Sequence, residues 1–76
     1  MSLIALEMPY ATAMDHEWDD LLGAGGPTPG QEHVFECLLS DLQWPAVQAK
    51  LDEKKVPYKV QLPGSVEREP YNNPTW

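Results

Sequence analysis

Proline and glycine punctuate this chain so often that they constrain its fold more than any other feature. The 76 residues contain eight prolines and five glycines. Proline fixes φ and removes a backbone donor, whereas glycine favours turns, so both residues interrupt regular elements. Irregular connections must therefore take up much of the chain. The densest stretch is GAGGPTPG, residues 23–30, which we expect to be a loop.

The length and the apolar content predict one small domain covering residues 1–76. A chain of this length buries only about 60–65% of its unfolded surface, which makes its stability marginal. The 42% content of hydrophobic residues is enough for a small core and too high for a wholly disordered chain. A larger core shared with a partner or with a second copy, as a homodimer, is compatible with this size.

The first 22 residues predict a strand followed by an acidic helix. Residues 3–8 form an apolar run that predicts a strand. Thr12 and Asp15 have the spacing of a helix capping box, and apolar residues then recur at helical spacing over residues 13–22. We expect Gly23 to cap the end of this helix. The buried side of the helix should consist of Met14, Trp18, Leu21 and Leu22.

Residues 31–62 predict a strand–helix–strand unit. Residues 33–39 are apolar on both faces, which is typical of a central strand, although Glu36 needs water or a partner. Residues 45–55 predict a helix with a proline in its first turn. Residues 58–62 then alternate apolar and polar side chains, which indicates a half-buried strand.

The expected fold is a small two-layer α+β sandwich with the order β-α-β-α-β. Three strands would be covered on one face by two helices. An unbroken crossover places the strands of residues 33–39 and 58–62 parallel if they share a sheet. Residues 63–76 contain three prolines and predict a proline-rich, extended C-terminal tail or a weak final strand.

Charge is distributed very unevenly along the chain. Residues 1–49 contain eight acidic residues and no Lys or Arg, whereas all five Lys and Arg residues fall in residues 50–76, and the net charge is −7. Such a field repels nucleic acid and anionic membranes, and it favours a basic protein surface as partner. The acidic residues expected on the outer side of the first helix are Asp15, Glu17, Asp19 and Asp20.

A metal site is a more specific interpretation of the acidic residues in the first expected helix. His16 and Asp20 are four residues apart, so both could face one ion, and His33 or Glu32 could add a ligand. The second histidine of the H-E-x-x-H zinc motif is missing, however. A solvated acidic helix face explains these residues without an ion, and we expect no metal and no cofactor.

The single cysteine, Cys37, excludes an internal disulfide and suits a reducing compartment. Its place in an apolar strand predicts a buried, inert thiol rather than a nucleophile. The apolar stretch at the N-terminus is too short for a signal peptide or a membrane span. These observations predict a cytoplasmic protein.

The aromatic residues divide into two groups. Trp18 and Trp44 lie on the apolar sides of the two expected helices and should be core residues. Tyr71 and Trp76 lie in the tail, where no local pattern buries them. Exposed aromatic residues often anchor protein interfaces. The tail therefore either docks on a partner or a second subunit, or folds back on its own domain.

The segment of residues 31–62 resembles one module of the glyoxalase/bleomycin-resistance (vicinal oxygen chelate) superfamily. The resemblance rests on His33-Val34 at the start of a strand, Leu51 in a helix, and the turn Val56-Pro57-Tyr58 into the next strand. It implies a metal or small-ligand site formed by dimerisation, with His33 as the only matching ligand position. The closing strand that carries the family's glutamate ligand has no counterpart in these 76 residues.

The function that these features favour is a small acidic module that binds a basic partner surface. It would act as an inhibitor, adaptor or accessory subunit rather than as an enzyme, in the manner of phage-encoded inhibitors of nucleic-acid-handling machines such as anti-CRISPR proteins. The alternative is the single glyoxalase-like module. The expected partner-binding residues are Asp15, Glu17, Asp19, Asp20, Tyr71 and Trp76.

Overall fold

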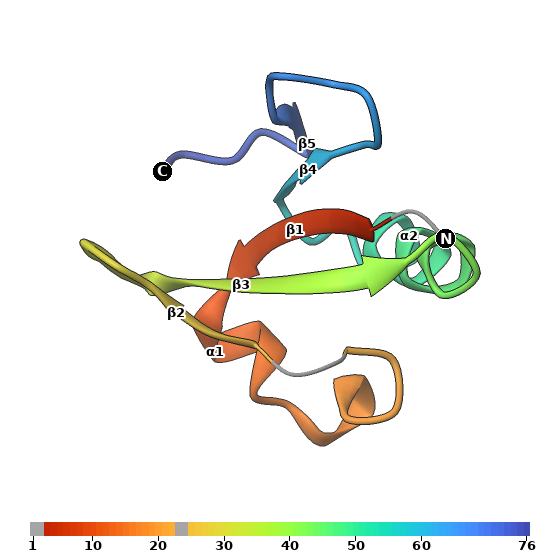
Figure 1. Cartoon of the computed structure of the whole chain (residues 1–76). Helices are drawn as coiled ribbons and strands as arrows, with labels where there is room; N and C mark the ends of the chain where they lie inside the picture. Colours follow the sequence, from red (N-terminus) through yellow and green to blue (C-terminus); the bar gives the residue numbers. More distant parts are fainter. Residues whose placement is uncertain (1–2, 23–24) are drawn as a thin grey trace.

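The structure is a computed structural model, and it describes residues 3–22 and 25–76. Figure 1 shows α1 and the turn after it on one side of β1 and β3, with α2 beside one end of these strands. The helices in the described residues do not combine the length and apolar character needed to cross a membrane. In chain order the elements are β1 (Leu3–Pro9), α1 (Tyr10–Ala13), the 3-10 helix η1 (His16–Trp18), β2 (Gly25–Thr28), β3 (Gln31–Ser40), α2 (Trp44–Glu53), β4 (Tyr58–Gln61) and β5 (Glu69–Tyr71).

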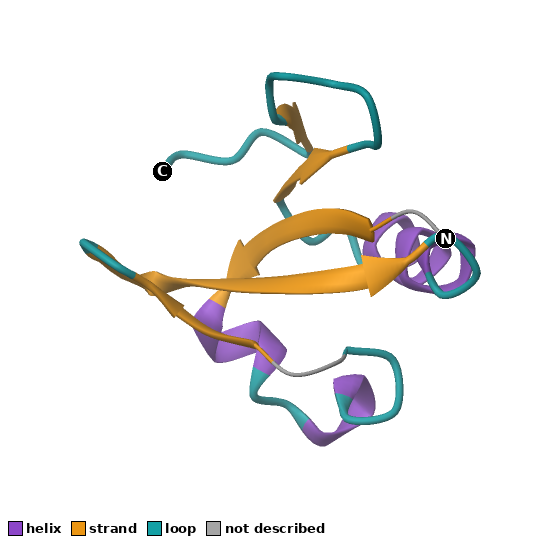
Figure 2. Cartoon of the chain, in the orientation of Figure 1, coloured by secondary structure: helices purple, strands orange, loops and turns teal. Residues whose placement is uncertain are grey.

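The strands form one five-stranded sheet in the order β2-β3-β1-β4-β5, and every neighbouring pair is antiparallel (Figure 2). Because β3 and β4 are each antiparallel to β1, they run parallel to each other with β1 between them. The strand–helix–strand unit is therefore a split β-α-β unit, whose gap is filled by the N-terminal strand. The predicted three-stranded sandwich covered by two helices is wrong. Sequence spacing indicates a crossover but does not tell whether another strand lies inside it.

The predicted helix of residues 13–22 does not form. Helix α1 begins directly after Pro9 and ends at Ala13, and Asp15 then adopts an extended conformation. The Asp15 carboxylate accepts a hydrogen bond from the Glu17 amide at 3.4 Å, which favours a separate 3-10 turn over a continued helix. No side-chain cap forms at α1. The cap expected at Gly23 lies outside the described residues.

Part of the glycine- and proline-rich segment is a strand rather than a loop. Residues Gly25–Thr28 pair with β3 as β2, at one edge of the sheet. An edge position tolerates Pro27, because an outward-facing backbone needs no N–H for a further partner. Gly30 has φ of +82° in the turn between β2 and β3, a conformation that glycine adopts without strain.

The later elements lie where the sequence predicts them. Strand β3 contains residues 33–39, α2 begins one residue before Pro45, and β4 begins at Tyr58. Trp18 and Trp44 are core residues as expected, with 0% and 9% of their surfaces exposed. The principal core side of the sheet is formed by Ile4, Leu6, Met8, Phe35, Cys37, Leu39, Tyr58 and Val60, and α2 adds Trp44, Val47 and Leu51.

The C-terminal segment folds back onto the domain and supplies the fifth strand. Strand β5 pairs with β4, and the ring of Tyr71 stacks on that of Tyr58 with 4.9 Å between centroids. The Asn72 side-chain amide donates to the Val56 carbonyl at 2.9 Å, and Asn72 and Asn73 both have positive φ. Asparagine tolerates this left-handed conformation better than most residues. Of the two alternatives expected for residues 63–76, an extended tail or a weak final strand, residues 69–71 form the strand.

Gly25 should be essential for the pairing of β2 with β3. A Cβ at this position would lie 2.5 Å from the Glu36 carbonyl oxygen and 2.8 Å from the Cys37 Cβ, whereas a Cβ at Gly26 would meet nothing within 4 Å. We predict that Gly25→Ala lowers the free energy of unfolding by about 1–3 kcal/mol, because backbone atoms must move apart. The matched Gly26→Ala should change it by less than about 0.5 kcal/mol. Urea denaturation measures both, and equal effects would contradict the register of β2.

Candidate protein-binding surface

The predicted acidic residues lie together, although on a short 3-10 turn and not on a helix. Asp15, Glu17, Asp19 and Asp20 are all exposed. Between them Trp18 points inward and is completely buried, so it anchors the turn to the core. We call these four residues the acidic surface.

Lys50 in α2 and Lys54, the C-cap residue of this helix, fasten the acidic surface to the domain. Lys50 Nζ donates to the Glu17 carbonyl and lies 4.9 Å from the centroid of the Trp18 ring. Lys54 Nζ lies 3.4 Å from Glu17 Oε2. Glu17 is thus paired within the chain, and the uncompensated charge of the acidic surface comes mainly from the aspartates that flank it. His16, whose side chain is fully exposed, contacts Asp19 at 3.1 Å.

The face of the sheet opposite the principal core contains a cluster of charged side chains that the sequence patterns did not predict. Glu7 and Glu36 are direct partners in the β1–β3 register, where two like charges repel each other. Arg68 Nη1 lies 2.8 Å from Glu7 Oε1 and 2.9 Å from Glu36 Oε2. Burial of the guanidinium opposes its charge, but the hydrogen bonds and charges of both glutamates outweigh this and raise the pKa of Arg68. The only sequence signal was an acid inside each apolar strand.

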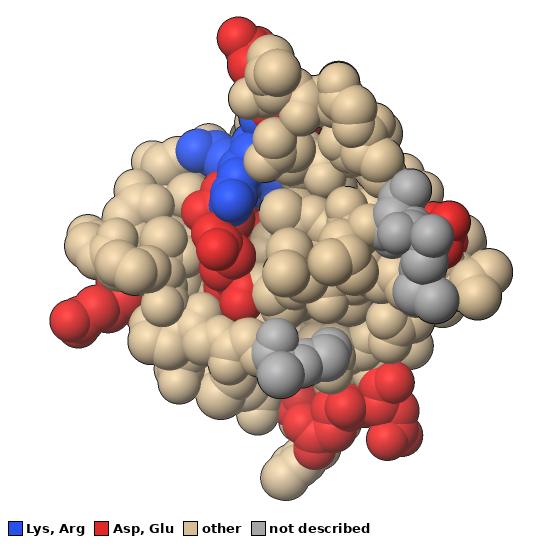
Figure 3. Space-filling model, viewed as in Figure 1, with Lys and Arg blue, Asp and Glu red and all other residues tan. Residues whose placement is uncertain are grey.

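Lys59 extends this cluster towards the C-terminal residue of the sequence. It is the β4 partner of Glu7 in the register, and its Nζ donates to the Trp76 carbonyl and lies 5.8 Å from the centroid of the Trp76 ring. Figure 3 shows basic atoms gathered in one place, against a band of acidic atoms, while other acidic groups stand at the periphery. Four of the five cations in the chain therefore make contacts with groups of the same chain.

A cleft of about 240 Å³ adjoins the acidic surface. Its wall includes Asp19 beside the apolar groups of Ala13, Trp18, Leu22 and Phe35. A long cationic side chain buries its aliphatic stem against apolar groups and keeps its charge near a carboxylate. The cleft therefore brings apolar side chains and one carboxylate together beside the acidic surface.

The residues weighed for other chemistry are placed apart. Among the described residues, no group of three or more His, Cys, Asp or Glu side chains could hold a metal ion. His16 lies on η1, whereas His33 is an exposed residue near the start of β3. Burial, followed by the charge of Glu36, raises the pKa of the Cys37 thiol to about 11. This thiol therefore stays protonated near neutral pH.

The two aromatic residues of the C-terminal segment are half-buried against their own domain. The Tyr71 hydroxyl donates to Glu69 at 2.6 Å while its ring packs on Tyr58. Trp76 lies beside Lys59. Each keeps part of its surface accessible, and their role in partner binding stays a prediction.

Comparison with protein-family models, with curated proteins and with solved structures gives no match. The resemblance of residues 31–62 to a glyoxalase-type module therefore also stays a prediction. The function has to be argued from the surface itself.

The bridge from Arg68 to the two glutamates should be the most important ion pair for stability. Only 10% of the Glu7 side chain is exposed. Arg68→Met would remove the cation that bridges the two facing carboxylates, and we predict a loss of about 1–3 kcal/mol of unfolding free energy. Adding Glu7→Gln and Glu36→Gln to this variant should restore part of the loss, since the repulsion disappears.

Lys54→Met provides the matched control for this prediction. Its pair with Glu17 is solvent-exposed, so the variant should lose less than about 0.5 kcal/mol. Thermal and urea unfolding measure both substitutions. A loss in Arg68→Met no larger than that in Lys54→Met would show that the bridge contributes no more than an ordinary surface pair.

Proposed function

We propose that this protein is a small acidic binding module that docks on a basic surface of another protein, as an inhibitor, adaptor or accessory subunit. The observation that carries this proposal is the internal use of its cations. Lys50, Lys59 and Arg68 contact groups of their own chain, and Lys54 pairs with Glu17. The net charge of −7 is thereby presented outward mainly by carboxylates.

The acidic surface is suited to this role because it is held in place before binding. Trp18 in the core and Lys50 on α2 fix the turn from both sides. A surface that is already ordered loses little conformational entropy when a partner binds. Asp15, Asp19 and Asp20 would meet the partner's cations, and the adjoining cleft would take the stem of one Lys or Arg side chain.

The electrostatic field of the chain indicates the kind of partner. A strongly negative small domain is steered towards positive grooves, including those that bind nucleic acid, and the attraction weakens as salt screens it. The module would compete there with the partner's normal anionic ligand. Inhibition or masking of such a groove is the simplest consequence of occupying it.

We predict that Asp15→Asn/Asp19→Asn/Asp20→Asn abolishes or strongly weakens partner binding. Proteins that the wild-type chain captures from an extract of its native cell would first be identified, and each candidate would then be purified. Titration calorimetry with the purified partner should show that this variant binds at least about tenfold more weakly than the wild-type protein, because three charges at the rim of the interface are lost. Wild-type affinity should also fall steadily between low and high salt.

A matched variant controls for net charge. Asp41→Asn/Glu53→Gln/Glu67→Gln removes the same number of exposed charges elsewhere. It should keep most of the wild-type affinity if the site is local. Equal losses in both variants would indicate only a general charge effect. Retention of full affinity by the aspartate variant would refute the proposal.

A further inference from the structure

A cavity of about 510 Å³ opens where β1 ends and where β3 and β4 begin. Its walls come from four separate parts of the chain: residues 9–11, residues 32–33, Pro57 and residues 75–76. The volume falls in the range of about 300–1,000 Å³ that is typical of small-molecule sites. The cavity shares no residue with the acidic surface.

The C-terminal segment completes this cavity. Trp76 forms one wall of the cavity. The Lys59 ammonium donates a hydrogen bond to the Trp76 carbonyl oxygen and lies near the Trp76 ring, so it holds this residue in place. Tyr10 belongs to the lining as well, and its ring lies 6.3 Å from that of Phe35, which fixes its position. Both aromatic walls are thus positioned by contacts outside the cavity, so the site is largely formed before a ligand enters.

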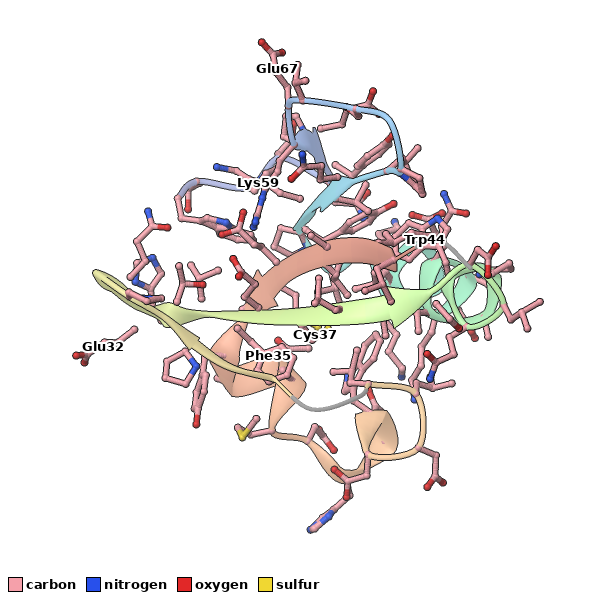
Figure 4. The ribbon with its side chains drawn as sticks, viewed as in Figure 1. Glu32, Phe35, Cys37, Trp44, Lys59 and Glu67 are labelled. Carbon is pink, nitrogen blue, oxygen red and sulfur yellow. The ribbon has the colours of Figure 1, made fainter. Side chains whose placement is uncertain are left out.

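The lining combines apolar groups with a negative mouth. Pro9, Ala11 and Pro57 provide rigid apolar surface between the two aromatic rings. Figure 4 shows Glu32 at the end of the β2–β3 hairpin, and this acid is one of the residues that line the cavity. Among the described residues that line the cavity, none is Lys or Arg. Aromatic faces and a carboxylate both attract cations.

We propose that this cavity binds a small aromatic amine. The apolar ring of the ligand lies against Tyr10 and Trp76, and its ammonium group points to the Glu32 carboxylate. The ring of Trp76 already lies within cation–π distance of the Lys59 ammonium, so the apolar ring of the ligand, and not its ammonium group, packs on Trp76. The net negative charge of the chain also favours a positively charged ligand.

The direct test is a titration of the ¹⁵N-labelled protein with three matched probes: phenethylamine, 2-phenylethanol and 3-phenylpropionate. They share a phenyl ring and differ mainly in charge. The chain has three tryptophans, so the indole signals of the buried Trp18 and Trp44 serve as internal references. Phenethylamine should shift the Trp76 indole and the amides of Ala11 and His33, with a dissociation constant on the order of 1 mM. The alcohol should bind more weakly and the acid most weakly.

Two variants locate the interaction. Trp76→Ala should abolish the saturable shifts, while unchanged Trp18 and Trp44 signals show that the fold is intact. Glu32→Gln should weaken phenethylamine about two- to fivefold and leave the alcohol unchanged, since only the cation meets the carboxylate. Glu67→Gln is the matched control: Glu67 is exposed on the far loop (Figure 4) and should not alter either probe.

The proposal is overturned if no probe gives saturable shifts at the cavity, or if the acid binds as tightly as the amine. It is also overturned if the cavity signals move with protein concentration alone, because a second copy of the chain would then be the occupant.

Discussion

The placement of Arg68 between Glu7 and Glu36 is the interaction on which the arrangement of the C-terminal third depends. The two carboxylates face each other across the β1–β3 pair, and Glu7 is almost entirely buried. A cation between two such carboxylates removes their repulsion, and here that cation comes from a distant part of the sequence. Bringing Arg68 over the sheet places the residues that follow it beside β4. The β5 pairing and the stack of Tyr71 on Tyr58 are then within reach.

The same contact shapes the outside of the molecule. A cation that neutralises an internal carboxylate no longer offsets the acids of the surface. Lys59 is likewise occupied, by Trp76, whereas Lys54 offsets Glu17 at the acidic surface itself. The outward field is therefore set by aspartates and glutamates that have no such partner. This links an internal packing requirement to the electrostatic character that the proposed function uses. The cavity beside Trp76 depends on the same folded-back segment.

Sequence patterns predicted the elements whose causes are local. Pro45 and the spacing of Trp44, Val47 and Leu51 marked α2, and the alternation after Pro57 marked β4. The helix predicted over residues 13–22 does not form, because the Asp15 side chain accepts a hydrogen bond from the Glu17 amide and favours a separate 3-10 turn. The spacing of apolar residues gives no information about this local competition.

Features that depend on distant partners could not be predicted in this way. Strand β2 has the composition of a loop and exists because β3 offers it an edge, and Gly25 allows the close approach. Strand β5 contains a proline and pairs only because β4 lies beside it. The partners of Arg68 are 32 and 61 positions away, at Glu36 and Glu7. The exposure of the four residues of the acidic surface could be predicted, because clustered acids stay in water, whereas the adjoining cleft depends on the fold; the role of these residues in binding stays a prediction.

Amide hydrogen exchange at β5 tests most directly whether Arg68 fastens the C-terminal segment to the sheet. The measurement compares the wild-type protein with Arg68→Gln and follows Tyr71 on β5 against Leu6 and Cys37 in the central strands. The account predicts that exchange at Tyr71 becomes at least about tenfold faster in the variant. The amides of Leu6 and Cys37 should still exchange more slowly than that of Tyr71. Unchanged protection of Tyr71 in Arg68→Gln would show that the segment is held by its other contacts, and it would contradict the central role of the bridge.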